Sequence, residues 1–367
     1  MHPNPLYWRT TLAGIGRTAG PIDFMQHMAG VPVLGDACPA EVRVPLRAVL
    51  RRAFVGGNSE APLADALADV SGWTSAAAPE PRAPRAQVVV PVRGAHDALG
   101  LCLACFDRHT SGEGRNDAGD VNVTLVSGAD DGAAVRNALD TCGAFGGGGL
   151  CSCIARTVVC TPKARTFAEN VNLGASQSRS EFVVLLNSDA FVGPGWLDAL
   201  LAPFADPEVV AAGPMGTNVS GHQNALAEES TATVADLKLT SERVALATRF
   251  FAQRRGELSM TSPYPARRLV GFCVAVRRSA WDRVGGMDER FENAYCDDDL
   301  SVRLSLVGKC VVVPDLLVLH EGQASFRELG DAGAYARGLA ENEVRFRAKW
   351  GWLRPDWDAW NDGRGWR

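Results

Sequence analysis

One apolar run constrains the fold of this chain more than any other feature. Residues 181–187, Glu-Phe-Val-Val-Leu-Leu-Asn, have the apolar character of a buried strand, and Asp189 follows just past its end. In an open α/β sheet the ligand lies in the crevice beyond the carboxyl ends of the strands. A carboxylate at that place can bind a divalent cation, and the cation can bind a diphosphate. The run therefore predicts a ligand site in which Asp189 is a metal ligand.

The same kind of pattern repeats through the middle of the chain. We expect strands at 88–92, 121–126, 157–160 and 182–186, and helices at 96–108, 167–176 and 194–204. Near-continuous apolar strands that alternate with helices are typical of a mostly parallel sheet covered on both faces. No Gly-x-Gly-x-x-Gly sequence follows the first strand, so a dinucleotide site of the usual kind is not expected. The predicted fold class is α/β.

The second half of the chain has a less regular pattern. We expect a long helical stretch at 228–255, a strand at 269–276, helices at 280–284 and 299–307, short strands at 310–313 and 316–319, and an amphipathic helix at 340–350. In the last helix the apolar positions repeat at helical spacing, which places them on one side. Glu343, Arg345 and Lys349 are then expected to face solvent.

Composition divides the chain into four parts. Residues 1–75 have apolar residues at helical spacing and are expected to form a small helical N-terminal region. A Pro/Ala-rich linker is predicted at 76–86, because such composition favours an exposed, semi-rigid segment. One large α/β domain is predicted at 87–351, followed by a Trp-rich C-terminal tail at 352–367.

The overall composition is ordinary for a soluble globular protein, with 46% hydrophobic and 22% charged residues in a chain of 367. The net charge of −5 argues against a surface that coats nucleic acid, although it does not exclude a local basic patch. The longest apolar stretches have about half the length needed to cross a bilayer. No secretion signal opens the chain. We therefore expect a cytoplasmic protein without an integral membrane segment.

The ten cysteines are expected to stay reduced, since no secretion signal precedes them. Cys142, Cys151 and Cys153 flank a run of four glycines and raise the question of a metal site. A structural zinc site needs four ligands, and no clear fourth ligand is present. An inserted loop with free thiols is the favoured interpretation, and metal binding by these cysteines stays open.

A series of short motifs follows in order between residues 87 and 351. They are Val-Val-Pro-Val at 89–92, Phe-Ala-Glu-Asn-Val-Asn-Leu-Gly at 167–174, Leu-Asn-Ser-Asp at 186–189, Gly-Trp-Leu at 195–197, Gly213 with Pro214, Asn218 and Gln223, Gly-Phe-Cys at 271–273, Arg-Arg at 277–278, Gly-Gly-Met-Asp-Glu-Arg-Phe at 285–291, Asp-x-Asp-Leu-Ser-x-Arg at 297–303, and His320. This order resembles that of the family 2 glycosyltransferases. The resemblance implies the GT-A fold, a Rossmann-like mixed, mostly parallel sheet flanked by helices.

The resemblance also implies roles for particular residues. Nucleotide contacts are expected from Pro91, Val92, Arg93, Ser127, Asp130, Asp131, Asn172, Asn187 and Ser188. Asp189 and His320 are expected to hold Mn²⁺ or Mg²⁺ against the diphosphate of a nucleoside-diphosphate-sugar donor. A carboxylate suits both ions, and a neutral imidazole suits Mn²⁺ better. Asp297 is the expected catalytic base, with Asp298 as the second candidate.

Two positions depart from the family pattern. Ser127 stands where the second strand usually ends in an aspartate, and Asp130 or Asp131 is a candidate to compensate. Asn187 replaces the first acidic residue of the metal-binding DxD motif. An amide oxygen is a weaker, neutral ligand than a carboxylate, so the metal would depend mainly on Asp189 and His320.

Sugar transfer from a nucleoside diphosphate has chemical needs that these residues can meet. The leaving diphosphate gains negative charge, which a cation stabilises. The sugar carbon becomes oxocarbenium-like, and the acceptor hydroxyl must lose a proton to a base. The three adjacent carboxylates at 297–299 repel one another, which should raise at least one pKa toward a useful value. The same run also suits a helix start, with Asp299 as the N-cap and Arg303 as its partner one turn later.

The predicted function is that of an inverting glycosyltransferase that moves a sugar from a nucleoside-diphosphate sugar to an acceptor hydroxyl. One alternative is a sugar nucleotidyltransferase, which would need a Gly-rich basic loop after the first strand, where only Arg93 and Gly94 are present. The other is a non-catalytic sugar-binding homologue, which Asn187 and Ser127 favour. The acceptor stays open between a glycan, a metabolite, a protein and a modified nucleic-acid base.

Overall fold

The computed structural model describes residues 84–94, 96–110, 121–141, 155–225, 239–292, 294–322 and 332–351. The chain divides into two units, Met1–Arg82 and Ala83–Arg367, and all described residues belong to the second unit. The predicted N-terminal region at 1–75, the tail at 352–367, and the three cysteines Cys142, Cys151 and Cys153 lie outside the described residues. The boundaries of the four predicted parts stay predictions.

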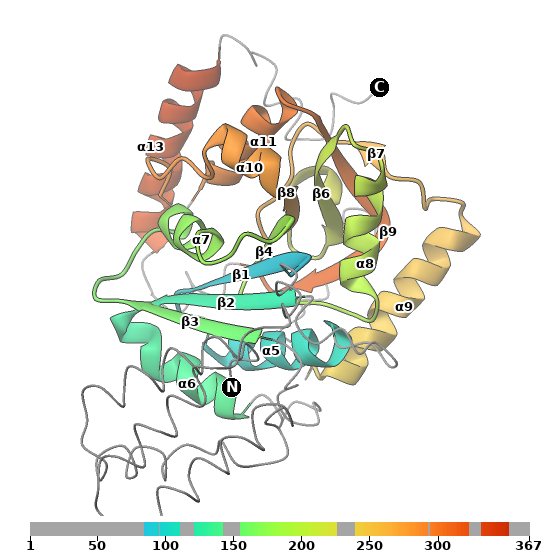
Figure 1. Ribbon diagram of the computed structural model, residues 1–367, viewed down its shortest axis with the longest axis horizontal. Coiled ribbons are helices and arrows are strands. Elements are labelled where there is room, and N and C mark those ends of the chain that lie inside the picture. Colours follow the sequence, from blue (N-terminus) through green and yellow to red (C-terminus); the bar gives the residue numbers. More distant parts are fainter. Residues whose placement is uncertain are drawn as a thin grey trace, which may run out of the picture. The chain divides into compact units, whose positions relative to one another are not determined.

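A single mixed sheet organises the described part of the chain (Figure 1). Its strands are β1 (Ala86–Val92), β2 (Val121–Gly128), β3 (Ala155–Thr161), β4 (Phe182–Leu186), β5 (Ala190–Phe191), β6 (Val209–Gly216), β7 (Tyr264–Pro265), β8 (Cys273–Arg277) and β9 (Lys309–His320). Their order is β3-β2-β1-β4-β8-β6-β9-β5, and β7 pairs with β9 outside this path. Strands β1 to β4 are parallel, β8 is antiparallel to both of its neighbours, and β6 is parallel to β9.

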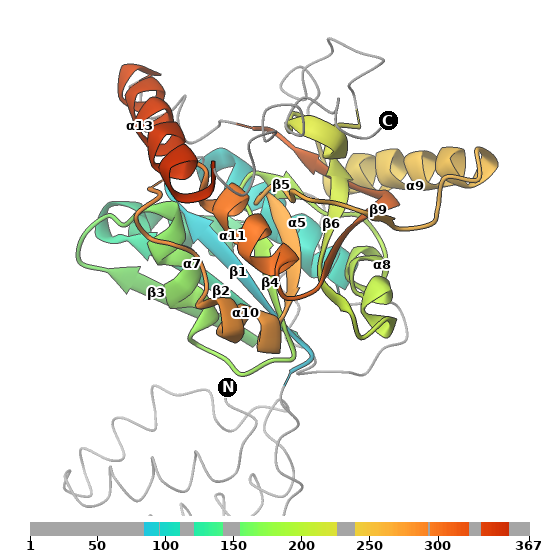
Figure 2. The ribbon, with the colours of Figure 1, turned by 90° about the horizontal axis from the view of Figure 1, so that it is seen from above.

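Helices cover the sheet on both sides (Figures 1 and 2). The α-helices are α5 (His96–Thr110), α6 (Gly132–Thr141), α7 (Phe167–Ala175), α8 (Trp196–Leu201), α9 (Ser241–Glu257), α10 (Arg278–Val284), α11 (Cys296–Ser305) and α13 (Ala332–Trp350), and the short 3₁₀ turns are η1 (Ala129–Asp131), η3 (Ala202–Ala205) and η4 (Gly221–Gln223). Helices α7, α10, α11 and α13 lie on one side, and α5 and α6 lie on the other. The predicted α/β class is confirmed.

The close approach of α7 to the sheet shows why the sequence folds this way. Thr166 and Glu169 form a capping box at the start of α7, which satisfies backbone N–H groups of the first turn. Near the other end, a Cβ atom on Gly174 would lie 2.3 Å from Cγ1 of Val89 in β1. Only a residue without a side chain fits there. The helix is therefore fixed against the strand whose carboxyl end leads to the candidate site.

Some strands differ from the prediction. One continuous strand, β9, replaces the two short strands expected at 310–313 and 316–319. Val313 pairs with Pro214 and Leu317 pairs with Met215, so the residues between Val313 and Leu317 bulge out of the ladder. Strand β6 was not expected, because Gly213 and Pro214 locally favour a turn. It is nevertheless buried along its whole length between β8 and β9.

Some helices also begin elsewhere than predicted. Helix α11 begins at Cys296, and Tyr295 occupies the N-cap position, so the expectation that Asp299 caps this helix is wrong. Helix α13 begins at Ala332, well before the predicted start at residue 340. Helix α6 was not expected at all. No described helix has both the length and the apolar composition needed to cross a bilayer.

Candidate active site

A short strand pairing places Asp189 beside His320. Ala190 of β5 pairs with His320 at the end of β9, and the N–H of Glu321 donates to the carbonyl oxygen of Asp189 at 3.0 Å. As a result, Nε2 of His320 lies 3.2 Å from Oδ1 of Asp189. Two stretches of chain that are far apart in sequence therefore meet at the two predicted metal ligands.

Asn187 completes this cluster. Its Nδ2 lies 3.3 Å from Nε2 of His320. Within the described part of the chain, Oδ1 of Asn187 and Nδ1 of His320 are buried without a hydrogen-bond partner. Buried polar atoms normally have partners, so each of these two atoms can still bond to a further group.

The geometry of this cluster fits a divalent cation. Two ligands that bind an octahedral ion at right angles, each about 2.1 Å from it, lie about 3.0 Å apart. The 3.2 Å between Asp189 and His320 matches this separation. No group of three His, Cys, Asp or Glu residues that could hold a metal occurs among the described residues. Asp189 and His320 would therefore leave coordination positions free for an amide oxygen, water or a ligand oxygen.

Neighbouring residues hold His320 in place. Its backbone N–H donates to Oγ1 of Thr217 at 2.8 Å, and that hydroxyl donates to the carbonyl oxygen of His320 at 2.9 Å. The ring of Phe272 packs against the imidazole, with 5.2 Å between the ring centroids. The carbonyl oxygen of Phe272 also accepts the N–H of Asn187 at 2.8 Å. The imidazole is thus oriented from two sides before any ligand binds.

Asp297 is the most accessible carboxylate of the acidic run, because it is half-buried whereas Asp298 and Asp299 are buried. Its Oδ2 accepts the N–H of Gly271 at 2.9 Å, and its Oδ1 accepts the N–H of Asp298 at 3.1 Å. Asp298 and Asp299 form salt bridges with basic side chains, whereas Asp297 forms none within the described residues. An oriented and partly exposed carboxylate of this kind can accept a proton from a ligand.

Asp298, the second candidate base, has a different environment. Nε of Arg268 donates to its Oδ1 at 2.7 Å. Burial raises the pKa of Asp298 to about 7, although the Arg268 guanidinium acts to lower it. Arg268 also donates to Oγ of Ser220 at 2.8 Å. Since Asp298 is buried beside its partner, the geometry favours Asp297 over Asp298 as the group that meets a ligand.

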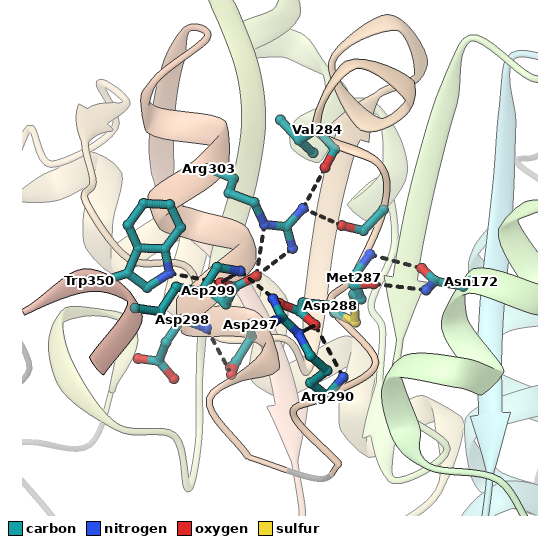
Figure 3. A network of polar contacts seen from close by, with 12 residues as sticks. Asn172, Val284, Met287, Asp288, Arg290, Asp297, Asp298, Asp299, Arg303 and Trp350 are labelled. Carbon is teal, nitrogen blue, oxygen red and sulfur yellow. Dashed lines mark hydrogen bonds and ion pairs between the residues drawn. The ribbon is translucent and has the colours of Figure 1, made fainter. Parts of the chain in front are cut away.

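Asp299 is a buried carboxylate that joins two helices through hydrogen bonds (Figure 3). It has no exposed surface, and Nε of Arg303 donates to its Oδ2 at 2.7 Å. This pair, one helical turn apart, is the one predicted from the sequence. The Oδ1 atom accepts Nζ of Lys349 at 2.6 Å and Nε1 of Trp350 at 2.8 Å. The expectation that Lys349 faces solvent is therefore wrong.

The carboxyl ends of β1 and β2 hold the first group of predicted nucleotide contacts. Val92 pairs with Ser127, which is fully buried, and within the described residues Oγ of Ser127 has no hydrogen-bond partner. Oδ1 of Asp131 accepts the N–H of Gly94 at 3.1 Å, which ties the two strand ends together, while Asp130 is exposed. Of the two aspartates proposed to compensate for Ser127, Asp131 is the one linked to β1.

The other predicted nucleotide contacts have different exposures. Pro91 is buried at the end of β1, and Arg93 is exposed just beyond it. Ser188, between Asn187 and Asp189, is buried. The structure thus brings Pro91, Val92 and Arg93 to one strand end and places Asn187 and Ser188 at the end of β4, a direct neighbour of β1.

Asn172 lies on α7 with its side-chain amide already engaged (Figure 3). Its Nδ2 donates to the carbonyl oxygen of Met287 at 2.9 Å and to Oε1 of Glu289 at 2.9 Å. Its Oδ1 accepts the N–H of Met287 at 2.8 Å. These bonds give Asn172 a structural role in joining α7 to the turn after α10, and its contact with a nucleotide stays a prediction.

Sequence reasoning missed several residues that shape the site. It did not identify the Gly271 N–H as the partner of Asp297, Phe272 as the neighbour of His320, or Lys349 and Trp350 as partners of Asp299. Gly271 and Phe272 belong to the Gly-Phe-Cys motif at 271–273, so the motif itself was the feature of the sequence that could have pointed to them. No local pattern indicates that the end of α13 meets α11, because this contact depends on tertiary structure.

Residues 154–285 match the family model described as glycosyl transferase family 2. The matched range includes Asn187 and Asp189 and ends before Asp297 and His320. The matched part of the chain is a glycosyl transferase family 2 domain, and the predicted family and enzyme class are confirmed. The mixed α/β sheet is the fold class predicted with that family.

Two curated relatives are similar to parts of the chain. The O-antigen biosynthesis protein RfbC of Myxococcus xanthus is 29% identical over 196 residues, which is 52% of this chain and 14% of that protein. The N-acetylglucosaminyl-diphospho-decaprenol L-rhamnosyltransferase of Mycobacterium tuberculosis is 35% identical over 147 residues, which is 38% of this chain and 47% of that protein. The aligned region thus spans less than half the length of either relative.

Solved structures give a more distant likeness. The mannosyltransferase PcManGT from Pyrobaculum calidifontis, in complex with GDP-Man and Mn²⁺, aligns with a TM-score of 0.45 and 18% identity. The alignment covers 76% of this chain and 64% of that chain.

Proposed function

We propose that this chain is an inverting glycosyltransferase that moves a sugar from a nucleoside-diphosphate sugar to an acceptor hydroxyl. Asp189 and His320 would hold a divalent cation, and Asp297 would act as the base. The observation that carries this proposal is the 3.2 Å approach of His320 Nε2 to Asp189 Oδ1 at the end of a buried strand. The match of residues 154–285 to glycosyl transferase family 2 supports the class of reaction.

The donor set of the cluster suits Mn²⁺ or Mg²⁺. Asp189 contributes a hard carboxylate oxygen, His320 contributes a neutral imidazole nitrogen, and Asn187 can add an amide oxygen. A bound ion of this kind stabilises the negative charge that develops on a leaving diphosphate.

Asp297 can accept the proton of the attacking hydroxyl. The N–H of Gly271 fixes one carboxylate oxygen, and the half-buried position leaves the side chain open to a ligand. A general base must lie within hydrogen-bond reach of the proton that it removes. One displacement assisted by one base inverts the anomeric carbon, because the hydroxyl attacks from the side opposite to the leaving group.

The strand ends of β1 and β2 are the proposed nucleotide contacts. The buried Oγ of Ser127, which has no partner within the described residues, can bond to a polar atom of the nucleotide. Two further residues stand near the same strand ends and can contact the ribose or a phosphate. They are Asp131, which is bonded to Gly94, and the exposed Arg93. Ser127 thus keeps a polar atom at the position where the family usually has a carboxylate.

We favour a glycan as the acceptor over a metabolite, a protein or a modified nucleic-acid base. One relative is an O-antigen biosynthesis protein, and the other is an L-rhamnosyltransferase named for N-acetylglucosaminyl-diphospho-decaprenol. Both names concern the assembly of glycans. The second name also makes an activated rhamnose, such as dTDP-rhamnose, a donor worth including in the panel.

A non-catalytic sugar-binding homologue is the second candidate. Asn187 favours it, since this residue lacks the charge of the usual acidic metal ligand. The sugar nucleotidyltransferase alternative has no support from the family match. A glycosyltransferase turns over its sugar donor, whereas a non-catalytic homologue binds the donor without turnover.

The test is the release of nucleoside diphosphate from UDP-glucose, GDP-mannose and dTDP-rhamnose with Mn²⁺. We expect slow release from one donor, and Asp297→Asn should reduce it by about 100-fold or more, with donor binding in calorimetry unchanged. Asp282→Asn on α10, whose side chain is 50% exposed, is the matched control and should keep wild-type turnover.

Wild-type turnover by Asp297→Asn would reject Asp297 as the base. Binding without release from any donor would favour the non-catalytic homologue. Formation of nucleoside triphosphate and sugar 1-phosphate when pyrophosphate is added to the donor would favour the nucleotidyltransferase.

A further inference from the structure

Helix α13 lies along the segment that leads to the proposed base. This segment, residues 288–299, joins α10 to the first turn of α11. Nδ2 of Asn342 donates to the carbonyl oxygen of Ala294 at 3.0 Å, and Nη1 of Arg345 donates to that of Arg290 at 2.6 Å. Two backbone carbonyl groups of the segment are thus bound by side chains that come from the C-terminal part of the described chain.

The last turn of α13 binds the two carboxylates at the ends of the same segment. Nζ of Lys349 lies 2.7 Å from Oδ2 of Asp288 and 2.6 Å from Oδ1 of Asp299, and Nε1 of Trp350 donates to the same Oδ1. Arg303 binds the other oxygen of Asp299, with Nη2 at 2.6 Å. A buried carboxylate needs such partners, because an uncompensated buried charge is strongly unfavourable. Asp299 therefore ties α13 to the first turn of α11.

The turn just before α11 has an unusual backbone. Tyr295 has a φ of 63°, in the left-handed region, although it carries a side chain. Such conformations persist only where the surroundings hold them. The ring of Phe346 in α13 lies 5.4 Å from that of Tyr295, centroid to centroid, and 6.4 Å from that of Phe291. Tyr295 is the N-cap of α11, so α13 packs against a residue that stands two positions before Asp297.

We propose that α13 positions the base, with Lys349 and Trp350 as positioning residues that act on Asp297 through Asp299 and the turn at Tyr295. This inference rests on the proposed function, because it assigns a purpose to the placement of Asp297. Three side chains donate hydrogen bonds to Asp299, and Asp297 stands two residues before it on the same helical turn (Figure 3). A displacement of about 1 Å at a reacting group can reduce the rate about 100-fold, so loosening this anchor should be visible in turnover.

The first test compares kcat and KM for nucleoside diphosphate release from the panel donor that the wild-type protein turns over fastest. Lys349→Met and Trp350→Phe remove the donors to Asp299 and keep most of the side-chain volume. We expect kcat to fall about 10- to 100-fold with the donor KM within about twofold of wild type. Lys349→Arg should restore most of the loss, since it keeps a cation at the same place.

Arg347→Met is the matched control. Arg347 lies on the same helix, is exposed, and forms an ion pair at 2.9 Å with Glu343 of α13 itself. It should keep the wild-type kcat. Wild-type kcat in both Lys349→Met and Trp350→Phe overturns the inference. Equal changes in kcat and donor affinity, together with a lower melting temperature, also overturn it, because they indicate a general loss of structure.

The second test does not depend on turnover. Amide hydrogen exchange in the peptide that spans residues 291–300 should become faster in Lys349→Met and Trp350→Phe and stay unchanged in Arg347→Met. Unchanged exchange in the first two variants overturns the inference. The assignment of Asp297 as the base fails separately, if Asp297→Asn keeps full turnover, and the transferase function fails if no donor of the panel is turned over. If instead Asp297→Asn is inactive and Lys349→Met is fully active, only the role of α13 is wrong.

Discussion

The backbone N–H of Gly271 donates a hydrogen bond of 2.9 Å to Oδ2 of Asp297. The next residue, Phe272, packs its ring against His320 at 5.2 Å. Two consecutive residues therefore touch the proposed base and a proposed metal ligand. The distance between these two parts of the site depends on how the chain enters β8, so small changes at Gly271 should affect chemistry more than binding.

Gly271→Ala should slow transfer and leave donor binding nearly unchanged. A Cβ atom at this position would lie 3.1 Å from Cβ of Asp297, so the carboxylate must move by a few tenths of an ångström. We expect kcat to fall about 10-fold, since a misplaced base loses its reach to the acceptor. Steady-state kinetics and calorimetric titration of the donor measure the two effects. Gly338→Ala, where the added Cβ meets no atom within 4 Å, is the control. A large loss of donor affinity with unchanged kcat would contradict this reasoning.

Asn187→Asp should strengthen metal binding. Nδ2 of Asn187 lies 3.3 Å from Nε2 of His320, and Oδ1 of Asn187 is buried without a hydrogen-bond partner in the described part of the chain. A carboxylate there would add a charged oxygen to the proposed ligands, and ligand charge raises affinity for a hard cation. The Mn²⁺ concentration that gives half of the maximal donor turnover should fall by about 10-fold or more. An unchanged or higher concentration would show that residue 187 does not approach the ion.

Elements that carry their own pattern could be predicted from the sequence. Strands β1 and β4 are apolar runs and α7 follows a third such run, so each was expected close to its observed position. Strand β6 contains Gly213 and Pro214, which locally favour a turn. Its strand conformation comes from the ladders with β8 and β9 on either side. Tertiary pairing overrides local preference there.

The residues of the site also divide into those that a local pattern predicts and those that only tertiary structure brings together. Asp189 could be proposed because it stands just past the end of an apolar strand, and His320 because its place in the order of motifs resembles that of the family 2 glycosyltransferases. Their contact depends on β5, which has two residues and is too short to have a recognisable pattern. Lys349 was expected to face solvent because helical spacing marks the apolar side of α13. Spacing alone does not reveal that the 288–299 segment lies against the side that carries Lys349.

The stability of the protein should respond to the ionisation of Asp298. Burial raises the pKa of Asp298 from 3.8 to about 7, against the effect of Arg268. The folded state therefore binds this proton more tightly than the unfolded chain. The resulting stabilisation is complete below about pH 3.8 and is lost as the pH rises through about 7.

Asp298→Asn tests this assignment, because asparagine keeps an oxygen for Arg268 and cannot ionise. The melting temperature of the variant minus that of the wild type should increase between about pH 4 and pH 7 and level off above. Thermal unfolding at a series of pH values measures the difference. A difference that stays constant across this range would show that Asp298 is not buried as a neutral acid.

Gly174→Ala should destabilise the fold without changing the chemistry of the protein that remains folded. The added Cβ would lie 2.3 Å from Cγ1 of Val89 and 3.1 Å from Cγ2 of Val126, both in the sheet. Overpacking of this kind costs about 1–3 kcal/mol in the free energy of unfolding. Urea denaturation gives the value. Gly256→Ala on α9, where a Cβ meets nothing within 4 Å, should instead stabilise by up to about 1 kcal/mol. Equal effects of the two substitutions would contradict the close packing of α7.

The most direct test of the proposed metal site is a crystal structure with Mn²⁺ and a nucleoside diphosphate, read by anomalous scattering from manganese. We expect a single strong peak within about 2.3 Å of both Oδ1 of Asp189 and a ring nitrogen of His320, with diphosphate oxygens on its open side. A manganese peak elsewhere, or bound nucleotide with no peak between these two side chains, would contradict the proposal.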